Sequence, residues 1–93
     1  MALRLIKKAG EITLLTGDEN LNDLTTQGLY HQNMVVKAKA ENNYPAGKAG
    51  LLEVHNPDAR MVYQRYTCFW SGEMYYRGSY DKEWGPWKKI LTE

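Results

Sequence analysis

The sequence predicts a small α+β domain that is predominantly antiparallel β, a meander sheet with one short N-terminal helix. Three observations support this fold class. Apolar and polar residues alternate over several short segments, which is typical of half-buried strands. Strong turn signals, Asn56-Pro57-Asp58 and Ser71-Gly72, separate these segments. Near the C-terminus, Trp84-Gly85-Pro86-Trp87 sets two large rings beside a tight bend.

The N-terminal residues 1–17 are interpreted as an arm or as the end of a longer stalk, and residues 18–93 as one domain. Leu3 and Leu5, and then Ile12 and Leu14, alternate with polar or basic residues. This spacing predicts one or two short strands within the arm.

A short helix is expected over residues 21–25. Asp18-Glu19-Asn20 supplies capping side chains before it, and Gln27-Gly28 ends it. Residues 29–39 are expected to be extended, with a break near Asn33, and an irregular loop follows.

The remaining strands are expected at residues 50–55, 61–70, 73–80 and 87–91. If Ser71-Gly72 closes a two-residue hairpin, Phe69 lies opposite Met74 and Thr67 lies opposite Tyr76. Both faces of this hairpin are then aromatic. An antiparallel sheet normally leaves one face polar, so we expect the second face to be covered by the N-terminal segment, a neighbouring subunit or a ligand.

The bulk properties exclude several classes of protein. The chain has 93 residues, 43% of them hydrophobic, which is enough for one domain with a modest core. A net charge of +1 gives no strong field toward nucleic acid or an anionic membrane. Cys68 is the only cysteine, which rules out an intrachain disulfide framework, and we expect its thiol to be buried and inert. No apolar run is long enough for a signal peptide or a membrane span, so we expect synthesis in the cytoplasm.

The aromatic and basic residues allow two interpretations, core or contact. Trp84 and Trp87 can stack on a pyranose or lock the C-terminal turn, and Trp70 is the better exposed candidate. Arg77 can stack on Tyr66, and the alternative is contact with a phosphate or uronate on a glycan. Arg60 and Arg65 are expected to be solvated, with ligand contact as the alternative.

Metal binding, catalysis and nucleic-acid binding are not supported. His31 and His55 lie far apart, without a second ligand at metal-binding spacing. Acidic residues lie near hairpin ends, where a pair at glycosidase separation is possible, but no nucleophile and base stand together. An aromatic sheet with arginines is typical of single-strand binders, yet the basic residues alternate with acidic ones instead of forming a stripe. We therefore predict no catalytic residue, no metal, no cofactor and no nucleic-acid partner.

Several fragments occur in the order found in one family. They are Asp18 to Tyr30, Asn43-Tyr44-Pro45-Ala46-Gly47 followed by Gly50 to Val54, Gln64-Arg65-Tyr66, Tyr75-Tyr76-Arg77 and Trp84 to Ile90. In this order the chain resembles the knob domains of R-type pyocin and phage tail fibres, over roughly residues 18–91.

The resemblance implies a non-catalytic module of a virion tail fibre that takes part in attachment to bacterial surface polysaccharide. The alternative is a purely structural spacer or assembly module. Other tail-fibre segments are then partners, and a homotrimer is expected in the intact fibre, although the isolated chain can be a monomer. The candidate carbohydrate contacts are Trp70, Tyr75, Arg77, Tyr80 and Trp84.

Overall fold

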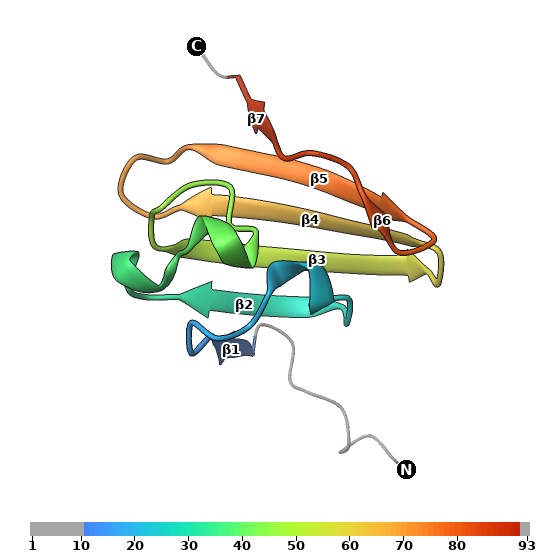
Figure 1. Cartoon of the computed structure of the whole chain (residues 1–93), viewed down its shortest axis with the longest axis horizontal. Coiled ribbons are helices and arrows are strands. Elements are labelled where there is room, and N and C mark those ends of the chain that lie inside the picture. The colour runs from blue at the N-terminus through green and yellow to red at the C-terminus, as the bar shows by residue number, and fades with distance from the viewer. Residues whose placement is uncertain (1–10, 92–93) are drawn as a thin grey trace.

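The structure, a computed structural model, describes residues 11–91 and contains one seven-stranded sheet (Figure 1). The strands are β1 (Ile12–Leu14), β2 (Gly28–Gln32), β3 (Gly50–Asp58), β4 (Met61–Cys68), β5 (Met74–Tyr80), β6 (Glu83–Trp84) and β7 (Lys88–Ile90). They follow the order β1-β2-β3-β4-β5-β6, and β7 also pairs with β5. The β1–β2 pair is parallel and all other pairs are antiparallel. The strand expected around Leu3 and Leu5 lies outside the described residues.

The predicted α+β class is wrong, because the described residues contain short 3-10 turns and no α-helix, with 46% strand. The expected helix is the 3-10 turn η2 (Leu21–Asp23), capped by the Asn20 side chain, which accepts from the Asn22 amide. The Gln64 side-chain amide donates to the carbonyl oxygens of Leu21 and Leu24, at 2.8 and 3.0 Å. These are acceptors that a continuing helix would use, so the tertiary contact ends the turn.

Of two further 3-10 turns, η3 (Val35–Lys37) interrupts the expected extended stretch, and η4 (Ala40–Asn42) lies where that stretch ends and the expected loop begins. The break near Asn33 is confirmed, since β2 ends at Gln32. The segments that join β1 to β2 and β2 to β3 lie over one face of the sheet in Figure 1. We call this the covered face.

The prediction that Ser71-Gly72 forms a two-residue hairpin turn is also wrong. Residues 69–73 form a longer loop, in which the Cys68 amide donates to the Glu73 carbonyl and the Gly72 amide donates to the Cys68 carbonyl. Thr67 therefore pairs with Met74, a shift of two residues from the expected register. Because side chains alternate with a period of two, this shift leaves the residues of β4 and β5 on their expected faces, while Phe69 and Trp70 lie in the loop.

The core lies on the covered face and centres on Tyr66, which is fully buried. Its hydroxyl donates to the Lys48 carbonyl at 2.6 Å, and its ring meets Tyr44 edge to face at 5.7 Å. Cys68 packs in the same cluster, where burial raises the pKa of its thiol. The predicted burial of Cys68 is confirmed, and its lack of reactivity stays a prediction. The rest of the cluster is Leu15, Leu21, Tyr30, Ala38, Leu52, Val54 and Val62.

Gly50 provides a test of how tightly β3 and β4 pack. A Cβ at this position would collide with the Thr67 carbonyl oxygen and lie 2.8 Å from the Tyr66 ring. We expect Gly50→Ala to lower the free energy of unfolding by about 2 kcal/mol or more, measured by urea denaturation. Gly47→Ala is the matched control, since its Cβ would meet only the Ala38 carbonyl, at 3.8 Å. Equal stability of the two variants would contradict this packing.

Candidate functional site

The Gly85-Pro86 bend folds two tryptophan rings around Arg77. The Arg77 guanidinium carbon lies 4.1 Å from the Trp84 ring centroid and 4.4 Å from that of Trp87. Each indole N–H is also fixed, since Trp84 donates to the Asn22 carbonyl at 3.1 Å and Trp87 to the Asn43 carbonyl at 2.7 Å. The Trp84–Arg77–Trp87 stack therefore ties the C-terminal segment to the loops of the covered face.

Arg77 belongs to this buried network. Its Nε donates to Gln64 Oε1 at 2.9 Å, and Gln64 in turn holds η2. Burial lowers the pKa of Arg77 to about 10, which still leaves the guanidinium charged at neutral pH. The expected stacking on Tyr66 is wrong, because Tyr66 pairs with Tyr75 and Arg77 pairs with Gln64 in the observed register. The faces of the two tryptophan rings attract the positive charge of Arg77. This attraction offsets part of the cost of burying the guanidinium without a carboxylate partner.

The five candidate contacts do not form one cluster. Arg77 and Trp84 touch, and Tyr75 lies half-buried on the same face, with its hydroxyl 3.4 Å from Glu73 Oε1. Trp70, in the β4–β5 loop, is 88% exposed and lies edge-on to Phe69. Tyr80, at the far end of β5, is 56% exposed and points to the other face of the sheet. Trp70 and Tyr80 thus lie at opposite ends of β5.

The opposite side of the sheet carries a row of exposed tyrosines and is not covered by any described segment. We call it the open face and define it by Met61, Tyr63, Arg65, Tyr76 and Tyr80. Tyr63 faces Gly78 across the β4–β5 pair, so no side chain separates its ring from those of Tyr76 and Tyr80. The expectation that both hairpin faces are aromatic is confirmed.

Tyr63 and Tyr76 were not among the candidate contacts, although the alternation placed them on one face with Met61. The signal that would have selected them is the composition of the other face. One face carries Val62, Tyr66 and Cys68, which suit a closed core. The opposite face carries Arg65 beside Tyr63. Within β4 the only charged residue, Arg65, marks the face that stays in water, whereas on β5 the charged Arg77 is buried on the covered face.

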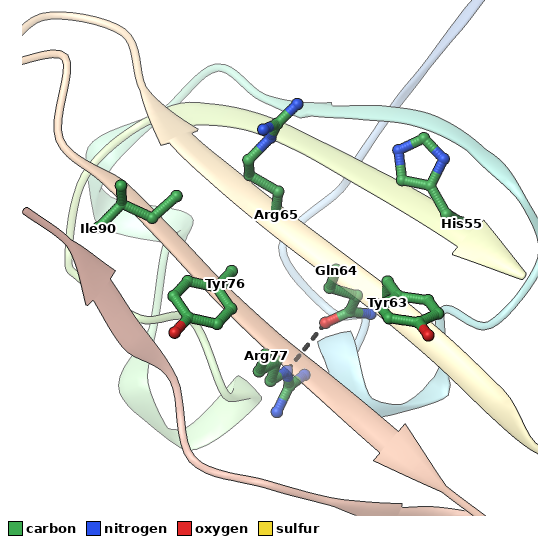
Figure 2. Close-up of a pocket in the computed structure, with 7 residues that line it drawn as sticks. All are labelled: His55, Tyr63, Gln64, Arg65, Tyr76, Arg77 and Ile90. Carbon is green, nitrogen blue, oxygen red and sulfur yellow. Dashed lines mark hydrogen bonds between the residues drawn. The ribbon is translucent and has the colours of Figure 1, made fainter.

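The open face contains a shallow hollow of about 370 Å³ (Figure 2). Tyr63, Tyr76 and Ile90 line its apolar part, and His55 and Arg65 project at its edge.

The edge of this hollow is polar. Arg65 donates to both oxygens of Glu53, at 3.2 and 3.3 Å, and His55 Nε2 lies 3.4 Å from Glu53 Oε1. Partial burial raises the pKa of Glu53, but the hydrogen bonds from Arg65 and His55 bring it below its ordinary value. An anionic Glu53 therefore fixes the guanidinium beside exposed rings, an arrangement suited to stacking and hydrogen bonding.

Among residues 11–91, no group of three histidine, cysteine or acidic side chains is placed to hold a metal ion. No helix in that range is long and apolar enough to cross a membrane.

Three solved structures share this fold, each with a TM-score of 0.78. An N-truncated R2-type pyocin tail fibre is 29% identical over 86% of this chain and 32% of its own. A C-terminal part of the Pseudomonas aeruginosa R2 pyocin fibre is 28% identical over 90% of this chain and 24% of its own. A C-terminal part of the P. aeruginosa R1 pyocin fibre is 30% identical over 87% of this chain and 21% of its own.

No protein-family model matches the chain, and no curated protein matches it either. The chain spans a third or less of the three fibre structures that it resembles. Fold and likeness together define a small β-rich tail-fibre module. More particularly, the chain is a tail-fibre domain like those of R-type pyocins and phages, which confirms the identification made from its motifs.

The role of Arg77 can be tested by Arg77→Ala. This change leaves Gln64 Oε1 without its donor and removes the group between the two rings. We expect the free energy of unfolding to fall by roughly 2 to 4 kcal/mol in urea denaturation. Arg65→Ala, which removes an exposed arginine of the same sheet, should change it by less than about 1 kcal/mol. A loss at Arg77 no larger than that at Arg65 would show that the stack does not support the fold.

Proposed function

We propose that this tail-fibre module is non-catalytic and attaches to carbohydrate on the surface of the bacterial host. The observation that carries the proposal is the open face, where Tyr63, Tyr76 and Tyr80 expose their rings while the other face is closed. A tyrosine ring is a large apolar surface whose burial contributes to the stability of a domain or an interface. A row of three half-exposed tyrosines on one face indicates a surface that a partner covers.

The chemistry of the open face suits a saccharide. The apolar face of a pyranose can lie on a tyrosine ring, as other apolar groups do. Gly78 leaves space beside Tyr63 for a ring to approach the strand. Arg65, Glu53 and His55 provide donors and acceptors for hydroxyl groups at the edge. The net charge of +1 favours such local contacts over general electrostatic attraction.

Two of the candidate contacts fit this proposal with exposed rings, Tyr80 on the open face and Trp70 on the β4–β5 loop. Tyr75 and Arg77 support the sheet from its covered face, and Trp84 closes the stack. In the intact virion we propose that the module lies in a tail fibre with other fibre segments, as a homotrimer.

Substitution of the open-face rings tests carbohydrate binding. We expect Tyr63→Ala combined with Tyr76→Ala to weaken binding of the recognised surface polysaccharide by more than about tenfold, since two stacking contacts are lost. Binding is measured by fluorescence titration against polysaccharides from a panel of Gram-negative bacteria. Both rings are about half exposed, so the fold should persist, as circular dichroism can verify.

Val36→Ala is the control, because Val36 is an exposed apolar residue on η3, away from the open face. Its affinity should equal that of the unaltered chain. Unchanged affinity in the tyrosine variant, or no saturable response to any polysaccharide by folded protein, would contradict the proposal.

The second candidate function is structural, a spacer or assembly module whose open face packs against a neighbouring chain. One observation favours it. Ile12 and Leu14 on β1 are exposed and extend the apolar surface across the sheet, beyond the area that a small ligand would need.

Light scattering of the isolated chain separates the two functions in part. A stable trimer that Tyr63→Ala and Tyr76→Ala dissociate would favour assembly through the open face. A monomer would place any trimer contact outside these residues and leave the carbohydrate proposal as it stands.

A further inference from the structure

A second hollow, of about 410 Å³, lies at the other end of the covered face from Tyr66. It opens between three turns, with Asp23 from η2, Arg60 from the β3–β4 turn and Lys82 from the β5–β6 turn. Ser79, which is buried, and the Trp84 ring form its walls. Its volume falls in the range of ligand sites, roughly 300 to 1,000 Å³. Because it lies on the covered side, it is separate from the open face.

Two cations of this hollow have no carboxylate partner. The ion pairs of the described residues join Lys48 and Lys89 to Glu73, and Arg65 and His55 to Glu53. Arg60 and Lys82 make none, although Asp23 also lines the hollow. Two hydrogen bonds hold the Arg60 backbone in place. Its amide donates to Asp58 Oδ1, and its carbonyl accepts from the Asp81 amide. Two unpaired cations on fixed turns favour a ligand with a negative group.

The backbone at Lys82 provides an independent argument. The β5–β6 turn places Asp81 and Lys82 at φ values of 54° and 74°, in the left-handed region. Turns of this kind favour asparagine followed by glycine, because a side chain at positive φ is strained. A lysine in the second position keeps that strain and places a cation beside the hollow. Strained positions of this kind concentrate at functional sites.

Trp84 presents a fixed aromatic wall. Arg77 covers part of its ring, and its indole N–H is bonded to the Asn22 carbonyl, so the ring has little freedom to lose when a ligand binds. Asn56 is held similarly, since its Nδ2 donates to the Thr25 carbonyl, which leaves its Oδ1 as an acceptor. A rigid ring beside amide and carboxylate acceptors suits a ligand rich in hydroxyl groups.

We propose that this hollow binds a saccharide unit that carries one negative group, a carboxylate or a phosphate. Arg60 and Lys82 contact the negative group, Trp84 stacks on the sugar ring, and Asp23 and Asn56 accept from hydroxyls. Asp23 disfavours a ligand that is negative throughout, such as nucleic acid. This site is distinct from the open face. It rests on the proposed function only in that the saccharide is taken to come from the bacterial surface.

The test follows the Trp84 indole N–H by NMR during titration with glucuronate, glucose 6-phosphate, glucose and inorganic phosphate. Saturation with glucuronate, glucose 6-phosphate or both is expected, and identifies the negative group. Glucose and inorganic phosphate should each bind at least about tenfold more weakly, because each lacks half of the recognised features. No saturation with either acidic sugar, or equal affinity for glucose or for phosphate alone, would overturn the proposal.

Lys82→Gly separates binding from folding. Glycine adopts a φ of 74° without strain, so the variant should unfold at a higher temperature. It should also bind the acidic sugar about tenfold more weakly, as should Arg60→Gln. Lys39→Gln removes an exposed lysine that does not line the hollow and should leave the affinity unchanged. Full affinity in both Lys82→Gly and Arg60→Gln would overturn the assignment.

The two carbohydrate proposals fail independently. Polysaccharide binding without any response to the acidic sugars would contradict the proposal for the second hollow and leave the open face as the attachment surface. A response to the acidic sugars without polysaccharide binding at the open face would contradict the proposal for the open face.

Discussion

The fold depends on the contact between Arg77 and the rings of Trp84 and Trp87. The segment after β5 has only two short strands, β6 and β7, to hold it to the sheet. Strands this short contribute few backbone hydrogen bonds, so the rings must supply most of the attachment. The stack reaches η2 through Gln64 and Asn22, and reaches the end of η4 through Asn43. One buried arginine thus joins the C-terminal segment to loops that precede it by more than thirty residues.

Closing one face of the sheet in this way leaves the other uncovered. The core around Tyr66 uses the loops, the 3-10 turns and both C-terminal tryptophans, so no described segment remains to cover Tyr63, Tyr76 and Tyr80. A small domain has little chain to spare, and a seven-stranded sheet with one covered face is the result. The surface available for contact is therefore a consequence of how the core is built.

The period-two pattern predicted β4, β5 and their faces correctly, because it depends only on neighbouring residues. It did not predict β6, and β3 continues to Asp58 through Asn56-Pro57-Asp58, where a turn was expected. β4 and β5 lie within the expected ranges, and the error of two residues in register did not move any residue to the other face. The pattern did not show which face is closed, since both are rich in tyrosine. Nor did it predict the parallel pairing of β1 with β2, which joins segments separated by a loop.

The hairpin error is local, between Cys68 and Glu73, whereas other failures arise from contacts distant in sequence. Gln64 is 43 residues from Leu21, yet it ends the turn that local capping signals predicted as a helix. The motif around Trp84 identified the family and indicated a core or a contact role, but not that its rings enclose Arg77. The candidate site was therefore predicted by residue type, whereas its grouping into a buried stack and an exposed face required the structure.

We propose that the two faces of the sheet have different roles, since the covered face stabilises the fold and the open face attaches to the host. The most direct measurement is an NMR map of tyrosine ring resonances as the recognised bacterial polysaccharide is added. We expect the resonances of Tyr63, Tyr76 and Tyr80 to shift together with one saturation curve, while those of Tyr44 and Tyr66 stay unchanged. Saturable binding that leaves the open-face rings unaffected would contradict it.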